Sequence, residues 1–175
     1  MNRNVKKIVT AGLIAAMYVV LTLLQNALLP GTTSAAVQYR ASEALCVLAL
    51  FTPSAIPGLT VGCIVSNIFA GLGLIDLIVG PIATLLAVLF MYLLRRKKAL
   101  GLPLLSLLCP ALFNGLLIGA EIGLFFSEGA AFFSVFWINA GLVALGELAV
   151  LLTLGLALFF AVEKNQGLKS YLTQV

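Results

Sequence analysis

The chain has 175 residues, of which 62% are hydrophobic and only 9% are charged, and its mean hydropathy is +1.18. A soluble domain carries about 25% charged residues, so this composition excludes a soluble protein and indicates an integral membrane protein. Because a membrane-spanning helix uses about 20 residues, residues 1–175 have room for a single all-α bundle of about six transmembrane helices and for no soluble domain.

Apolar stretches of helical length are separated by proline, glycine or clustered charge. They predict helices at about residues 7–26, 41–51, 56–70, 75–94, 103–126 and 132–162. The first stretch follows a basic start and could imitate a secretory signal. Its apolar part, residues 8–24, is longer than a usual signal core, and further spans follow it. We therefore interpret it as the first membrane span.

The first predicted helix carries small residues at a spacing of four, Ala11 with Ala15 and Gly12 with Ala16. Such a stripe allows the backbone of another helix to approach closely. It therefore predicts either a contact with a partner protein or packing inside the bundle. The pattern alone does not choose between the two.

The lysines and arginines give the chain a net charge of +4 and concentrate at three places. These residues are Arg3, Lys6 and Lys7 at the start, Arg95, Arg96, Lys97 and Lys98 after the fourth predicted helix, and Lys164 and Lys169 in the tail, while Arg40 stands alone. Cytoplasmic loops are enriched in such residues. We expect a multi-pass protein of the cell membrane with both termini and the loop at 95–98 in the cytoplasm. This distribution argues against nucleic-acid binding, and contact with anionic lipid heads follows from the same charges.

The three cysteines, Cys46, Cys63 and Cys109, each lie within an apolar run, and the chain has no histidine. We interpret them as buried small hydrophobic residues rather than as a disulfide framework or a zinc site. The chain also lacks the Gly-x-x-x-x-Gly-Lys loop that cradles nucleotide phosphates. We therefore expect no metal, no cofactor and no catalytic residue, and any ATP has to be hydrolysed on another subunit.

Polar side chains are rare in the predicted spans and concentrate in the half of the bundle that faces outward. The candidates for contact with a ligand are, in chain order, Gln38, Tyr39, Arg40, Glu43, Asn67, Asp76, Asn114, Glu121, Trp137, Asn139 and Glu147. A carboxyl group at membrane depth costs about 2.5–3.5 kcal/mol on insertion scales, so it points inward and usually has a function. Asn114 and Glu121 are seven residues apart and Asn139 and Glu147 are eight apart, so we expect each pair to lie on one face of its helix. The spacing predicts one polar pocket, open to the outside and closed toward the cytoplasm.

Each candidate also has a structural interpretation. Arg40 and Glu43 have the spacing of an ion pair at the start of a helix. Asp76 could cap a helix, where the helix dipole favours a carboxylate, and Trp137 could anchor the chain at the membrane interface. The asparagines could join helices by hydrogen bonds, and the deep glutamates could be paired structural carboxyls.

The six-helix size, the Ala-x-x-x-Ala stripe and the outward polar pocket resemble the substrate-binding (S) subunits of energy-coupling-factor (ECF) transporters. More narrowly, residues 37–45 (Val-Gln-Tyr-Arg-Ala-Ser-Glu-Ala-Leu), residues 56–59 (Ile-Pro-Gly-Leu) and Asn67 resemble the QueT family. The resemblance implies uptake of a queuosine precursor, a 7-deazaguanine such as preQ1, preQ0 or queuine. It also implies a transmembrane coupling subunit, T, on which Ala11 and Ala15 dock, and two cytoplasmic ATPases.

The expected pocket suits such a ligand. A carboxylate can accept the neighbouring N–H groups of a guanine-like edge, and Trp137 or Tyr39 could stack on the flat ring. The excess of acidic groups favours a neutral or cationic ligand. The alternatives are an S subunit for another flat vitamin such as thiamine or riboflavin, an intramembrane enzyme that uses paired carboxylates, and a structural or assembly subunit. The enzyme lacks a recognisable nucleophile with its base, and the assembly subunit leaves the outward carboxylates unexplained.

Overall fold

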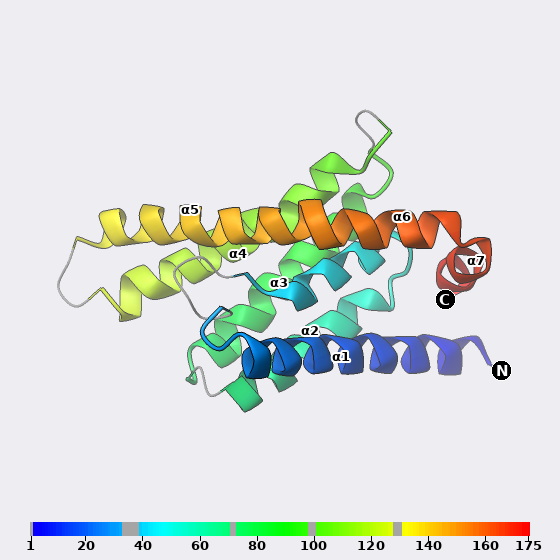
Figure 1. Cartoon of the computed structure of the whole chain (residues 1–175), viewed down its shortest axis with the longest axis horizontal. Helices are drawn as coiled ribbons and strands as arrows, with labels where there is room; N and C mark the ends of the chain where they lie inside the picture. The colour runs from blue at the N-terminus through cyan, green and yellow to red at the C-terminus, as the bar shows by residue number, and fades with distance from the viewer. Residues whose placement is uncertain (1, 33–38, 71–72, 98–100, 128–130) are drawn as a thin grey trace.

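The computed structural model describes residues 2–32, 39–70, 73–97, 101–127 and 131–175, and each regular element among them is a helix (Figure 1). In chain order the elements are α1 (Arg3–Leu28), the 3₁₀ helix η1 (Ala41–Leu50), α2 (Ala55–Ala70), α3 (Asp76–Leu94), α4 (Leu104–Phe125), α5 (Phe132–Val150), the π-helical segment η2 (Leu151–Gly155), α6 (Leu156–Lys164) and α7 (Gln166–Gln174). The all-α class that the sequence predicts is confirmed.

Four helical stretches are long and apolar enough to cross a membrane: α1, α3, α4 and the 33-residue rod formed by α5, η2 and α6. They coincide with the helices predicted at 7–26, 75–94, 103–126 and 132–162. The other two predicted helices are present as η1 and α2, but they are shorter, with 10 and 16 residues. Length and composition therefore support four spans, and the count of six stays a prediction. The sequence analysis did not predict α7, which is short and mostly polar.

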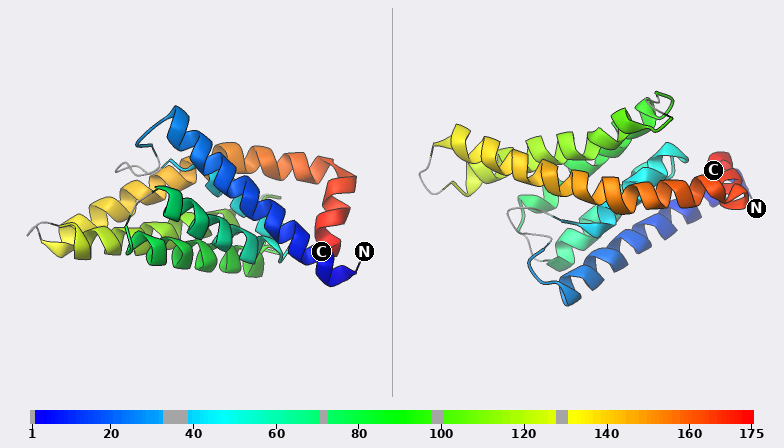
Figure 2. Two further views of the ribbon diagram at one scale, coloured as in Figure 1. Left: turned by 90° about the horizontal axis from the view of Figure 1, so that it is seen from below. Right: turned by 45° about the horizontal axis from the view of Figure 1, so that its top comes forward.

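Consecutive helices pack against each other, with the most extensive contacts between α1 and α2, α2 and α3, α3 and α4, and α4 and α5. Between them lies η1, which touches all of these helices as well as η2 and α6. Both termini lie at the same end of the bundle (Figures 1 and 2). At that end the hydroxyls of Tyr171 in α7 and Thr10 in α1 share a hydrogen bond of 3.0 Å. Helices α1 to α6 thus surround η1.

The buried face of α1 is mostly polar. Its buried side chains include Thr10, Tyr18, Thr22 and Gln25, whereas large apolar side chains such as Leu13 (59% exposed) point away from the bundle. This is the reverse of a helix in a soluble protein. It suits a helix whose outer face meets lipid and whose polar groups find partners inside.

The polar ridge on α1 holds the start of η1. Thr22 donates a hydrogen bond of 2.8 Å to the Ser42 hydroxyl. Gln25 donates to the carbonyl of Tyr39 and accepts from the backbone N–H of Ala41 at 2.8 Å. A 3₁₀ helix rises about 2.0 Å per residue and an α-helix about 1.5 Å. The ten residues of η1 therefore reach about 20 Å instead of about 15 Å, and its first turn carries Glu43 into the centre of the bundle.

Two glycines let α2 approach α1 closely. A Cβ atom added to Gly58 would lie 2.7 Å from the carbonyl oxygen of Ala11, and one added to Gly62 would lie 3.1 Å from that of Ala15 and 2.8 Å from the Cβ of Tyr18. One side of the stripe on α1 therefore packs inside the bundle. A Cβ on Gly12 would meet no atom within 4 Å, because Gly12 lies on the exposed side.

This contact predicts different effects of the same substitution at two glycines. Gly58→Ala should lower the free energy of unfolding by about 1–3 kcal/mol, because the added methyl group overpacks the α1–α2 contact. Gly12→Ala should leave it unchanged or raise it by up to about 1 kcal/mol through helix propensity. Reversible unfolding by denaturant in mild detergent measures both. Equal effects at the two positions would contradict the close contact.

Candidate functional site

A small polar cavity lies where η1, α3, α4 and α5 meet. Its volume is about 10 Å³, which is the space of about one water molecule. The residues around it are Arg40, Glu43, Asp76, Gly80, Thr84, Asn114, Ile118 and Glu147. The structure thus brings together five residues that the sequence selects separately, from four elements that are distant along the chain.

Glu43 lies at the start of η1 and is almost fully buried. One carboxylate oxygen accepts a hydrogen bond from the Tyr18 hydroxyl, and the other accepts one from the Cys46 thiol at 3.1 Å. The sequence analysis missed both donors, because a tyrosine and a cysteine in apolar runs are typical of a hydrophobic core. A signal for Tyr18 existed, since Tyr18, Thr22 and Gln25 follow helical spacing on one face of α1.

A chain of hydrogen bonds connects the start of η1 to α2 and α3. Arg40 donates from Nη1 to the Asn67 side-chain oxygen at 3.5 Å, and Asn67 donates to the backbone carbonyl of Asp76 at 3.1 Å. Gly80 makes room for this chain, because a Cβ there would lie 2.7 Å from Nδ2 of Asn67. Among the described residues the one salt bridge joins Lys169 to Glu163. Arg40 and Glu43 therefore form no direct salt bridge in the described part of the chain, although the sequence spacing allows one.

Asn114 and Glu147 join α4 to α5. The Asn114 amide donates to Oε1 of Glu147 at 2.8 Å, and both side chains are buried. The helix-joining interpretation of Asn114 and Asn67 thus agrees with the geometry. This interpretation is compatible with a role of Glu147 in ligand binding, because Oε2 of Glu147 has no hydrogen-bond partner among the described residues.

Four buried polar atoms in this region have no hydrogen-bond partner among the described residues. They are Nε of Arg40, Oδ2 of Asp76, Oε2 of Glu121 and Oε2 of Glu147. An unsatisfied buried polar group costs about 1–3 kcal/mol, and more when it is charged. Three acceptors and one donor are therefore available to a small polar molecule that enters the region.

The sequence model of the QueT transporter family matches residues 8–164 of the chain. The chain belongs to this family. The QueT family resemblance drawn from residues 37–45, 56–59 and Asn67 is confirmed. A protein of Lactococcus lactis subsp. cremoris described as "Queuosine precursor transporter QueT" is 38% identical over 78 residues, which are 45% of this chain and 44% of that protein. The alignment thus spans less than half of the relative. No solved structure matches the chain significantly.

In this QueT family member, the remaining candidates among the described residues do not line the polar cavity. Glu121 is buried on α4 within electrostatic range of Asp76, so it belongs to the same polar region. Asn139 donates to the Val135 carbonyl of its own helix at 2.8 Å. Tyr39 is 38% exposed, and Gln38 lies outside the described residues.

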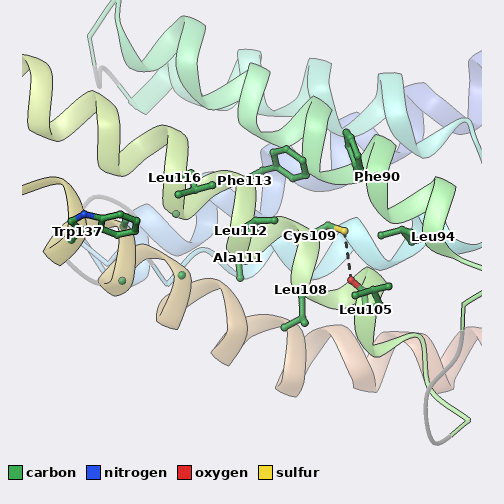
Figure 3. Close-up of a pocket in the computed structure, with 14 residues that line it drawn as sticks. Phe90, Leu94, Leu105, Leu108, Cys109, Ala111, Leu112, Phe113, Leu116 and Trp137 are labelled. Carbon is green, nitrogen blue, oxygen red and sulfur yellow. Dashed lines mark hydrogen bonds between the residues drawn. The ribbon is translucent and has the colours of Figure 1, made fainter. Parts of the chain in front are cut away.

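Trp137 is 64% exposed and lines a separate apolar groove on α3, α4 and α5 (Figure 3). The geometry therefore places it apart from the polar cavity, and we do not include it in the candidate site. Ala11 and Ala15 are partly buried at the contact with α2. The candidate site consists of Arg40, Glu43, Asp76 and Glu147 around the cavity, together with the amides of Asn67 and Asn114 and the nearby carboxyl group of Glu121.

The Tyr18 hydroxyl is predicted to stabilise the buried side chain of Glu43. Tyr18→Phe removes one of the two hydrogen-bond donors to Glu43 and should lower the free energy of unfolding by about 1.5–3 kcal/mol, as expected for a bond to a charged group. Tyr171→Phe is the matched control. It removes the hydroxyl that is shared with Thr10 at the edge of the bundle and should cost about 0.5–1.5 kcal/mol. Denaturant titration of both variants in detergent tests the difference, and a Tyr18→Phe protein as stable as the parent would disprove it.

Proposed function

We propose that the chain is the substrate-binding S subunit of an ECF-type transporter and captures a queuosine precursor, a 7-deazaguanine, outside the cell. The observation that supports this most directly is the set of unpaired acceptors, Asp76, Glu121 and Glu147, in the polar region of a QueT family member. The name of the Lactococcus relative supports the same ligand class. In this proposal all six predicted helices cross the membrane, with η1 and α2 as the short spans.

The ligand edge and the unpaired atoms are chemically complementary. A guanine-like edge presents neighbouring N–H donors, and a carboxylate is an acceptor with two oxygens. Glu147 offers Oε2 to the ligand while Asn114 holds Oε1. Arg40 offers Nε to the ring carbonyl or a ring nitrogen. Asp76 and Glu121 remain for an amine on the ligand, since a charge-assisted bond between an ammonium and a carboxylate is among the strong ones.

The cavity has to expand on binding. Its volume of about 10 Å³ holds one water molecule, whereas pockets for small molecules occupy about 300–1,000 Å³. The described conformation is therefore the closed one in this proposal. Binding separates the walls, and the unpaired polar atoms supply the hydrogen bonds that stabilise the open cavity.

Transport in this proposal needs a coupling subunit T and two ATPases, because the chain has no phosphate-binding loop. The stripe with Ala11 and Ala15 is the proposed docking surface for T. Since α2 covers one side of the stripe, the partner approaches from the side of Gly12 and Ala16, which is exposed. The basic residues that follow α3 and both termini face the cytoplasm in this arrangement.

The ligand role of Glu147 predicts a loss of affinity. Glu147→Gln replaces an acceptor with a donor, so a ligand N–H would face an amide N–H. Losing one buried charge-assisted hydrogen bond costs about 1.5–3 kcal/mol, which corresponds to about 10- to 150-fold weaker binding. Titration calorimetry with preQ1, preQ0 and queuine on the purified chain measures this.

Glu163→Gln is the control, since it removes a carboxylate that is paired with Lys169 outside the cavity, and it should bind like the parent. If Glu147→Gln also binds like the parent, the site assignment is wrong. If the parent binds thiamine or riboflavin and none of the 7-deazaguanines, the substrate assignment is wrong.

The docking role of α1 predicts a variant that binds ligand but does not transport it. Ala16→Trp adds bulk on the exposed side of the stripe, where the α1–α2 contact is not disturbed, and should abolish ATP-driven uptake without changing the Kd of the isolated chain. Leu145→Trp, at a position that is 62% exposed on α5, should transport normally. Uptake by vesicles that contain the full set of subunits tests both variants, and normal transport by Ala16→Trp would remove this docking surface.

A further inference from the structure

A second cavity lies on the outer side of α4 and α5, away from the polar site. It is an open groove of about 610 Å³, and nearly all of its surface is apolar (Figure 3). Its rim is formed by exposed leucines of α4, namely Leu108, Leu112 and Leu116. We call it the α4–α5 groove.

Small residues make the floor of the α4–α5 groove. Gly115 of α4 packs so closely on α5 that an added Cβ would lie 2.9 Å from the carbonyl oxygen of Ala140. Ala111 and Ala144 line the groove beside this contact. On the other side stand the rings of Phe90 and Phe113, with their centroids 5.0 Å apart. The groove therefore forms because α4 and α5 pack closely at small residues, while larger side chains stand on either side of this contact.

The dimensions of the groove suit a slim apolar chain. Its wall on α4 extends from Leu105 to Leu116, which is about 17 Å at 1.5 Å per residue. A volume of about 610 Å³ over that length gives a mean cross-section of about 36 Å². A helix about 10 Å across has a cross-section of about 80 Å². The mean cross-section is thus closer to that of a slim apolar chain than to that of a helix.

One end of the groove carries unpaired positive charge. Leu94 lines that end and is followed by Arg95, Arg96 and Lys97. Arg95 lies over the ring of Tyr92 and donates to its carbonyl oxygen, whereas Arg96 and Lys97 are exposed. Within the described part of the chain, no carboxylate forms a salt bridge with these residues. Basic groups beside an apolar groove between membrane helices attract anionic lipid headgroups.

We propose that the α4–α5 groove binds one acyl chain of an anionic phospholipid, whose headgroup lies against Arg96 and Lys97. The apolar lining gives the acyl chain an apolar surface to pack against. The two cations favour a headgroup of negative charge. The inference does not depend on the proposed substrate, because none of the residues around the polar cavity lines the groove.

Trp137 allows a direct test. It is the only tryptophan of the chain, and it lies in the groove (Figure 3). Bromine atoms on an acyl chain quench tryptophan fluorescence on contact. The full chain is reconstituted into phosphatidylcholine bilayers that contain rising fractions of dibrominated phosphatidylglycerol or of dibrominated phosphatidylcholine. We expect half-maximal quenching at a several-fold lower fraction of the anionic lipid.

Two variants distinguish the groove from general contact with the bilayer. Gly141→Leu places a large side chain at the groove, at a position where an added Cβ would meet no atom within 4 Å. It should abolish the preference for phosphatidylglycerol. Gly12→Leu is the matched control, since Gly12 is equally open but lies on α1, and it should keep the preference. The double variant Arg96→Gln/Lys97→Gln should quench equally with both lipids.

Equal quenching of the parent by both brominated lipids would overturn the proposal. So would an unchanged preference in Gly141→Leu, provided that circular dichroism shows the parent's helix content. If the groove instead binds a partner protein, both brominated lipids should quench the isolated chain equally. The same measurement therefore tests that alternative. Failure here leaves calorimetric binding of a 7-deazaguanine unaffected, and the reverse also holds.

Discussion

The burial of carboxylates inside an apolar bundle is the constraint on which the arrangement of helices depends. A charged group at the membrane centre costs about 2.5–3.5 kcal/mol on insertion scales, and donors from neighbouring elements reduce that cost. Tyr18 of α1 donates to Glu43 of η1, and Asn114 of α4 donates to Glu147 of α5. These bonds hold η1 against α1 and join α4 to α5, so the polar site also determines how the helices pack.

Irregular helical segments lie close in the chain to the two glutamates of the cavity. Glu43 lies on a 3₁₀ helix, and the π-helical segment η2 follows one turn after Glu147. The two irregular segments contact each other, and a Cβ on Gly155 of η2 would lie 3.2 Å from Val47 of η1. Single π-helical turns are rare and often occur at functional sites. Here one irregular segment carries Glu43, and the other begins four residues after Glu147.

The sequence predicts the spans and the polar cluster because charge and depth in the membrane restrict both. It predicts less about the face of its helix on which each residue lies. Asn114 and Glu121, seven residues apart, are separated by about 20° of rotation, whereas Asn139 and Glu147, eight apart, are separated by about 80°. Asn139 accordingly bonds to its own helix. The 3₁₀ form of η1 gives no sequence signal, because Ser42 to Ala49 are buried on all sides and show no periodicity.

The two faces of the α4–α5 pair restrict how the polar cavity can open. Asn114 and Glu147 join these helices on the inner face, and Gly115 and Gly119 let their backbones approach Ala140, where added Cβ atoms would lie within 3.0 Å. Such close packing resists separation, since it allows no sliding without a clash. On the opposite wall, Arg40 and Asn67 are held by a hydrogen bond of 3.5 Å, and Nε of Arg40 is unpaired. The expansion that a ligand needs is therefore expected from movement of η1 and α3 against a fixed α4–α5 pair.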